Sequence, residues 1–152
     1  MAFHGRFSAH FQGQTRSVVT AAGQYLKGLM QAERKNMERM EEAVKDCDEQ
    51  RLQHMLTDSV WDHRGVLDQV AKEADAQLGG SAESGLLIDE SGFAKKGTHS
   101  VGVARQWCGR LGKVDNCQVG VVAALGRGHL AALTDVRLFV PEEWAGDEQR
   151  CK

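Results

Sequence analysis

Asp89 is the residue of this sequence whose position most directly suggests chemistry. It follows the apolar run Gly85–Ile88, which predicts a buried strand that ends at the acid. A carboxylate at the end of such a strand is costly unless it is paired, hydrogen-bonded or bound to a metal ion. In the alternative interpretation Asp89 has only a structural role, and it caps a turn with Ser91 just past the strand end. These residues alone do not decide between the two interpretations.

A glycine-rich, basic segment follows between residues 92 and 118. It carries five Lys or Arg residues against the single acid Asp115, a net charge of +4, whereas residues 1–85 carry 10 Lys or Arg against 13 Asp or Glu, a net charge of −3. A basic segment in an acidic protein fits contact with phosphate, and it fits a solvated loop equally well. The side chains available for such contact are Lys95, Lys96, His99, Arg105, Arg110 and Lys113.

The cysteines offer no recognisable metal or redox motif. The four of them form no CxxC pair and are expected to be reduced, buried or incidental thiols. A zinc site would need Cys108, Cys117, His99 and His129 to converge, and their spacing matches neither a finger nor a ribbon.

The first 80 residues predict a helical domain. Apolar residues recur at intervals of three and four within residues 18–29, 37–44 and 52–56, which is the periodicity of amphipathic helices. A fourth helix is predicted from the N-cap candidate Ser59 to the glycine pair at 79–80. Three methionines at helical spacing are expected to pack in the core and not to form a binding surface: Met37, Met40 and Met55.

The pattern changes after Gly80. Strands are predicted at residues 85–89, 119–125 and 130–140, and the basic segment between the first two is expected to be a loop or an irregular hairpin. The turn between the second and third strands is so short that they should pair antiparallel.

These elements predict an α+β chain. A helical N-terminal domain, residues 1–80, is a candidate DNA-binding domain, and residues 81–152 form the first strands of an α/β domain. The longest uncharged apolar run, residues 119–125, is far below the roughly 20 residues that a membrane helix needs. The N-terminus carries no secretory signal, so a cytoplasmic protein without a membrane partner is expected.

The region around Asp89 resembles a known family. The sequence LLIDESGFAKKGTHSVGVARQWCGRLGKVDNCQVGV, which begins at Leu86, resembles the block that opens the catalytic domain in a group of bacterial insertion-sequence transposases of the DDE superfamily. The sequence RLFVPEEWAGD, from Arg137 onwards, resembles the segment that follows in that family. Residues 1–80 are similar more loosely. The resemblance covers nearly the whole chain and is specific over residues 86–146.

The resemblance implies a ribonuclease-H-like catalytic domain, of which residues 81–152 would be the first three strands. In that family two aspartates and a glutamate hold two divalent ions, Mg²⁺ or Mn²⁺, for attack on a DNA phosphodiester. Asp89 is the one catalytic and metal-binding position that carries over, with Glu90 as a supporting residue. The six basic or titratable residues named above then become DNA-backbone contacts. Gln106 and Trp107 could be structural or touch DNA, and the sequence does not decide.

The family's second aspartate and its glutamate have no counterpart in these 152 residues. We therefore expect an N-terminal fragment that is inactive alone, from a truncated or frameshifted gene or one half of a split reading frame. Its expected partners are transposon-end DNA, a second copy or full-length transposase subunits, on the nucleoid. The alternative function is a non-catalytic DNA-binding or transposition-modulating protein. Strands without their later partners should also leave an open edge and an uncovered sheet face.

Overall fold

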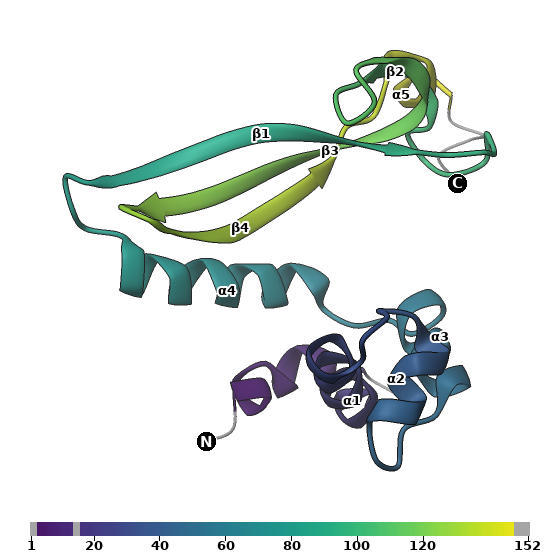
Figure 1. The fold of residues 1–152 in the computed structure, drawn as a ribbon, viewed down its shortest axis with the longest axis vertical. Helices are drawn as coiled ribbons and strands as arrows, with labels where there is room; N and C mark the ends of the chain where they lie inside the picture. The colour runs from purple at the N-terminus through teal and green to yellow at the C-terminus, as the bar shows by residue number, and fades with distance from the viewer. Residues whose placement is uncertain (1–2, 14–15, 148–152) are drawn as a thin grey trace. The chain divides into compact units, whose positions relative to one another are not determined.

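The computed structural model describes residues 3–13 and 16–147 (Figure 1). By its contacts the chain divides into two compact units, Met1–Gln69 and Val70–Lys152. The first unit is helical and the second carries the sheet, so the predicted α+β class is confirmed. The division falls within the fourth helix, and the proposed domain boundary at residue 80 stays a prediction.

The helices of the first unit follow the predicted periodicity. Asn36 and Asp48 begin the second and third α-helices as N-caps, with side-chain oxygens that accept the backbone N–H of the residue three positions later at 3.0 Å and 2.6 Å. Within the described residues, no helix is long and apolar enough to cross a membrane. The elements are η1 (Phe3–Arg6), η2 (Ser8–Phe11), α1 (Val19–Gln31), α2 (Met37–Ala43), α3 (Glu49–Thr57) and α4 (His63–Leu78).

The core of the first unit forms where α1, α2 and α3 meet. Gly28 of α1 allows the close approach of α2, because a Cβ at this position would lie 2.6 Å from Cγ of Met40. Met40 and Met55 are buried and Met37 packs against the same cluster, so the expectation that the methionines belong to the core is confirmed. The buried members of the cluster are Val18, Ala21, Ala32, Met40, Leu52 and Met55.

The predicted start of the fourth helix is wrong. α4 begins at His63 and not near Ser59. Asp62 is its cap, because Oδ1 of Asp62 accepts the backbone N–H of Gly65 at 2.8 Å while Oδ2 lies 3.2 Å from Nδ1 of His10. The Ser59 hydroxyl instead donates to the backbone carbonyl of His54 at 3.1 Å, at the end of α3, so Ser59 does not cap α4.

The second unit is built around one long strand. β3 pairs antiparallel with β1 along one edge and with β2 and then β4 along the other (Figure 1). The predicted antiparallel hairpin is confirmed, and its turn contains Gly128 with a φ of 60°, a left-handed value that glycine adopts without strain. The elements are β1 (Ser84–Ala94), β2 (Ala104–Cys108), β3 (Lys113–Arg127), β4 (Leu130–Leu138) and α5 (Glu142–Ala145).

Of the two predicted alternatives for residues 92–118, a loop or an irregular hairpin, the structure has the hairpin, because β2 pairs antiparallel with the start of β3. β1 runs to Ala94, β2 occupies residues 104–108 and β3 starts at Lys113, so the sheet has four strands and not three. The glycines and charges of this segment hide its strands because alternation is visible only where one face is apolar. Backbone pairing with β3 creates these strands.

The apolar residues of β1 and β4 are largely exposed. Leu86, Ile88 and Leu133 have 64%, 66% and 68% of their surface accessible. β1 and β4 each pair with β3 alone among the described strands, so each presents an open edge as expected. A tendency of residues 86–152 to aggregate or unfold in isolation stays a prediction.

The Asp62 cap should make the stability of the first unit depend on acid pH. The Gly65 N–H and the His10 side chain lower the pKa of Asp62 below its usual value. A carboxyl whose pKa is depressed in the folded state stabilises the fold above its unfolded pKa, about 3.9, and loses this contribution as the pH falls through the folded pKa. We expect Asp62→Asn, which keeps the cap, to show a smaller loss of urea resistance between pH 5 and pH 2 than the wild type.

Asp68→Asn is the matched control, since Asp68 is an exposed residue of the same helix. Equal pH dependence of the Asp62→Asn variant and the wild type would contradict the role given to this carboxyl.

Candidate functional site

Asp89 lies in the middle of β1, where its backbone is opposite Val122 of β3. Its side chain is exposed, and Oδ1 accepts the backbone N–H of Glu90 at 2.8 Å. Within residues 3–13 and 16–147 no other partner of this carboxylate is found. The carboxylate is therefore accessible to a ligand from solution.

The expectation that Asp89 ends a buried strand is wrong, and so is the alternative of a turn with Ser91. β1 continues beyond Asp89 to Ala94, and Ser91 is itself paired with Gly120. The apolar run before Asp89 is exposed on both faces of the sheet, because Leu86, Leu87 and Ile88 alternate between the faces and each has more than half of its surface accessible. Because Asp89 is exposed, burial does not require its carboxylate to have a partner. The case for a functional role rests on its accessibility and on its place in the family-like sequence block.

The two nearest acids in the register lie on the other face of the sheet. Residues directly opposite one another share a face, which groups Asp89 with Val122 and Val136. Glu90 follows Asp89 in the strand, and Asp135 pairs with Ala123, the neighbour of Val122. Neither acid can join Asp89 on one face, so Asp89 stands among apolar neighbours.

The described residues do not make a metal site by themselves. They contain no group of three His, Cys, Asp or Glu side chains placed to hold an ion. Mg²⁺ is usually held by one or two carboxylates together with waters and substrate phosphates, so Asp89 fits one ligand position by its chemistry. The set of acids that two ions require is not supplied by the part of the chain that the structure describes.

Two of the residues weighed for zinc belong to the sheet core. Cys108 and Cys117 are fully buried beside Val119, and burial raises the pKa of the Cys117 thiol. His129 lies at the turn between β3 and β4, twelve positions after Cys117. The prediction that cysteines are buried is confirmed for Cys108 and Cys117. Cys47 is a half-buried free thiol, and Cys151 lies outside the described residues.

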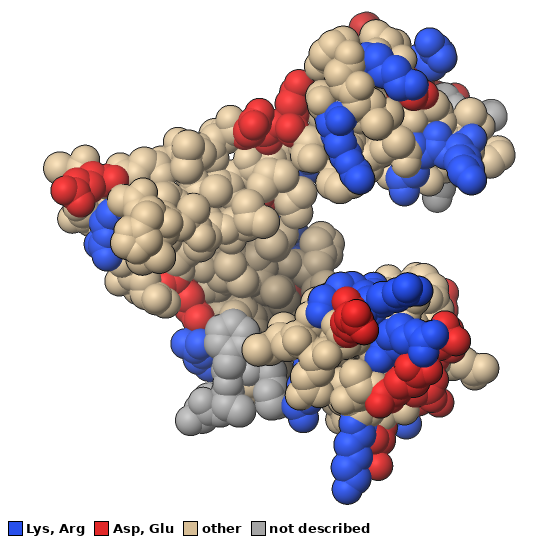
Figure 2. Space-filling model, viewed as in Figure 1, with Lys and Arg blue, Asp and Glu red and all other residues tan. Residues whose placement is uncertain are grey.

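The predicted DNA-contacting residues gather at the β2 end of the sheet unit. Figure 2 shows Lys and Arg side chains concentrated there, whereas the surface over β1, β3 and β4 is mostly uncharged. They occupy the β1–β2 connection, β2 itself, the β2–β3 turn and the first residue of β3, and all are exposed: Lys95, Lys96, His99, Arg105, Arg110 and Lys113.

Asparagine and glutamine side chains hold the loop that carries Lys95. Nδ2 of Asn116 donates to the carbonyls of Lys95 and Gly97 at 2.7 Å and 3.0 Å. Nε2 of Gln118 donates to the Val101 carbonyl at 2.6 Å. Sequence reasoning missed these positioning residues, although both fall inside the Asn-Cys-Gln stretch of the family-like block, which was the available signal.

Gln106 is also structural. Its Nε2 donates to the Cys117 carbonyl at 2.9 Å and to the Gly102 carbonyl at 3.3 Å. These bonds join the start of β2 to β3 and to the preceding loop. The question that the sequence left open for Gln106 and Trp107 is thus answered for Gln106.

One acid reduces the charge of the basic end. Nζ of Lys113 lies 2.8 Å from Oδ2 of Asp115. The Lys113 hydrogen bond, followed by the Asn116 backbone N–H and the charge of Arg105, lowers the pKa of Asp115 below its usual value. Asp115 therefore stays ionised, and the segment keeps its excess of positive charge in the other cations.

Asp89 and the basic end are separate features of the sheet. Lys95 lies six residues after Asp89, and the first five of these six steps are within β1. At about 3.3 Å per residue this corresponds to roughly 20 Å along the strand.

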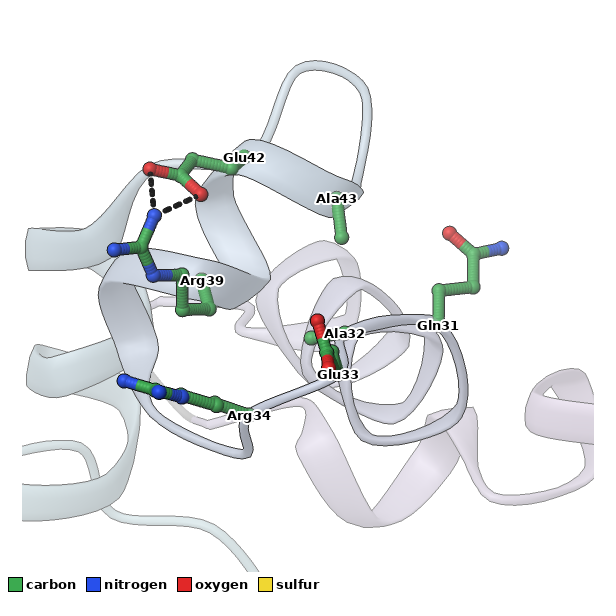
Figure 3. A pocket seen from close by; sticks show the side chains of 7 residues that line it. All are labelled: Gln31, Ala32, Glu33, Arg34, Arg39, Glu42 and Ala43. Carbon is green, nitrogen blue, oxygen red and sulfur yellow. Dashed lines mark hydrogen bonds and ion pairs between the residues drawn. The ribbon is translucent and has the colours of Figure 1, made fainter.

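The first unit contains a polar pocket between the end of α1 and α2 (Figure 3). Its charged lining is balanced, because Arg39 makes two 2.7 Å hydrogen bonds to the carboxylate of Glu42 and the remaining pair is Arg34 and Glu33. The pocket brings together no arrangement of acid, base and nucleophile, and it carries no candidate active site.

Comparison with known proteins decides the family. Residues 6–152 match the DDE superfamily endonuclease family. The chain belongs to this family. A probable transposase for insertion sequence element IS701 from Microchaete diplosiphon is 36% identical over 124 residues, which cover 78% of this chain and 32% of that relative. No solved structure gives a significant match.

Two points follow for this member of the DDE superfamily. The resemblance found in the sequence is confirmed, and the helices and antiparallel sheet are consistent with a ribonuclease-H-like domain. The chain spans about a third of the length of the curated relative that it matches.

Trp144 fastens α5 to the basic end of this DDE-family chain. It is 2% exposed, and its indole Nε1 donates to the Val103 carbonyl at 2.7 Å, one residue before β2. We expect Trp144→Phe to lower the free energy of unfolding by about 1–3 kcal/mol, because the buried Val103 carbonyl loses its donor while the ring remains. Urea unfolding followed by circular dichroism measures this change.

Trp107→Phe is the matched control, because Trp107 is exposed and its substitution should stay within about 0.5 kcal/mol. Equal effects of the two substitutions would contradict the role of the Trp144 hydrogen bond.

Proposed function

We propose that this chain is part of an insertion-sequence transposase and supplies the first acid of a metal-dependent DNA cleavage and joining site. The observation that carries the proposal is the position of Asp89. It is an accessible carboxylate in the middle of β1, within a chain that matches the DDE endonuclease family over residues 6–152. The two nearest acids in the register, Glu90 and Asp135, lie on the other face of the sheet. Asp89 would therefore bind a metal ion without a second carboxylate from its neighbours in the described sheet.

Asp89 would hold Mg²⁺ or Mn²⁺ together with acids from outside residues 1–152 or from another chain. Such ions neutralise the phosphate charge and favour attack on a phosphodiester. One exposed carboxylate binds a hydrated ion weakly. Residues 1–152 by themselves are therefore expected to be inactive, and a second copy or full-length transposase subunits are the partners that would complete the site.

The basic end of the sheet would bind the DNA backbone. Lys and Arg side chains there can neutralise phosphates without reading base sequence, and the transposon ends are the expected DNA. The contact residues proposed are those predicted from the sequence: Lys95, Lys96, His99, Arg105, Arg110 and Lys113. DNA binding would place the protein on the nucleoid in the cytoplasm, with the helical first unit as a further candidate for DNA contact.

A second candidate function is a non-catalytic DNA-binding or transposition-modulating protein. It is favoured by the absence, within the described residues, of any group of three metal-binding side chains. In this case the basic end would occupy transposon DNA or pair with active subunits, and Asp89 would be an inherited residue.

Asp89→Asn should remove a weak metal site. In the wild type, Mn²⁺ is expected to broaden the amide NMR signals of residues around Asp89, because a paramagnetic ion held at the carboxylate relaxes nearby nuclei. We expect this local broadening at Glu90 and Val122 to disappear in Asp89→Asn. Glu90→Gln is the matched control, since Glu90 is the neighbouring acid on the other face. Unchanged broadening in Asp89→Asn would rule out the proposed ligand.

Nicking of supercoiled DNA in the presence of Mg²⁺ tests whether residues 1–152 are inactive or whether copies of the chain assemble an active site. The 152-residue chain should not nick it. Nicking that is lost in Asp89→Asn would mean that copies of the chain assemble an active site together, and the expected inactivity would be wrong.

Substitution of two arginines should weaken the salt dependence of DNA binding. Each phosphate contact contributes about 0.9 to the slope of log affinity against log salt on duplex DNA, so Arg105→Gln with Arg110→Gln should reduce the slope by about 2. Fluorescence anisotropy of a labelled duplex at several salt concentrations measures the slope. Arg137→Gln is the control, because Arg137 pairs with Asp135 on the sheet face opposite Asp89. An equal reduction in the control would show that the contacts are not localised at the basic end.

A further inference from the structure

Trp107 differs from the other tryptophans of the chain. Trp61 and Trp144 each donate the indole N–H to a backbone carbonyl, at 3.2 Å and 2.7 Å. Trp107 is 56% exposed on β2, and no hydrogen-bond partner or ring contact of its indole is found among the described residues. An exposed tryptophan ring with no hydrogen bond or ring contact among the described residues is available to a binding partner.

Trp107 lies among exposed apolar side chains, and several positively charged side chains lie near them. Val114, directly opposite on β3, is 50% exposed, and Leu111 in the adjoining turn is also exposed. Arg105 lies two residues earlier on β2 and therefore on the same face as Trp107. Arg110 and Lys113 flank the turn, and Asp115 is the acid of this group.

Glycine keeps one side of the indole open. A Cβ at Gly109 would lie 4.0 Å from Nε1 of Trp107, whereas the glycine itself places no side chain there. Gln106, the preceding residue of β2, lies on the other face of the sheet, where it bonds to the carbonyls of Cys117 and Gly102. The ring is thus accessible beside a cluster of cations.

We propose that Trp107 is a stacking platform for an unpaired nucleotide base of DNA, whose phosphates contact Arg105 and Arg110. This inference rests on the proposed DNA-binding function and deepens it. Bases within a duplex are covered by their neighbours, so a flat ring can stack only on a base that is single-stranded or turned out of the helix. The combination of an aromatic face and flanking cations is the arrangement by which proteins hold single-stranded DNA.

The stacked nucleotide is not the one at Asp89. Trp107 is opposite Val114 and Asp89 is opposite Val122, eight positions apart on β3. At about 3.3 Å per residue the two points are roughly 26 Å apart along the strand. Trp107 would therefore hold DNA that has been opened away from the site of cleavage.

The test compares two DNA probes of the same length, an oligothymidine single strand and a fully paired duplex. Binding of the 152-residue chain is followed by anisotropy of labelled DNA and by quenching of tryptophan emission. We expect Trp107→Leu to lower affinity for the single strand roughly 5- to 150-fold, the equivalent of about 1–3 kcal/mol per stacked base, and to leave duplex affinity unchanged. Trp107→Phe, which keeps a ring, should retain most of the single-strand affinity.

Leu111→Ala is the matched control, because it removes exposed apolar surface from the same turn without removing a ring. Wild-type single-strand affinity in Trp107→Leu, or an equal loss in Leu111→Ala, would overturn the stacking role. If Arg105→Gln with Arg110→Gln weakens both probes while Trp107→Leu weakens neither, the stacking role fails and the proposed backbone contacts stand. Absence of binding by the wild type to either probe would overturn both.

Discussion

The hydrogen-bonded register of β3 is the constraint on which the second unit depends. One edge of this strand holds β1, and the other holds β2 and then β4, so three strands take their positions from a single partner. Because side chains alternate between faces, a shift of one residue in any of these pairings would move every side chain of that strand to the opposite face. Asp89 would then exchange places with Glu90 relative to the rest of the sheet.

The same register separates two kinds of surface. At one part of β3, Gly92, Cys108 and Cys117 approach closely enough that a Cβ on the glycine would lie 2.6 Å from the Cys108 sulfur. Cys108, Cys117 and Val119 form this compact core, and the side chains of Trp144 and Asn116 bond to the backbone of the basic end at Val103 and Lys95. Along the rest of β3 the apolar side chains of β1 and β4 remain exposed around Asp89. A basic end held by side-chain hydrogen bonds and an exposed apolar face with one acid therefore share one sheet.

The separation has a consequence for the proposed chemistry. A cation cluster adjacent to Asp89 would compete with a metal ion for the carboxylate, because an opposite charge within a few ångströms pairs with it directly. The cations lie instead around β2 and the start of β3, away from Asp89, where the proposed phosphate contacts would not neutralise the acid. The exposed Trp107 lies at this basic end and not beside the acid.

The sequence by itself determined the helices of the first unit, the methionine core and the β3–β4 hairpin, because periodicity and turn glycines are local properties. It also identified the family-specific block and Asp89 within it. Three features became clear only from the tertiary structure. β1 continues past Asp89, residues 104–108 form a strand, and Asp62 caps α4 in place of Ser59. The tertiary structure also assigned Gln106 to the interior and Trp107 to the surface. Except for the Asp62 cap, which binds the nearby Gly65 N–H, each of these depends on a partner distant in the chain, because β-pairing and burial are set by contacts between segments far apart in the sequence.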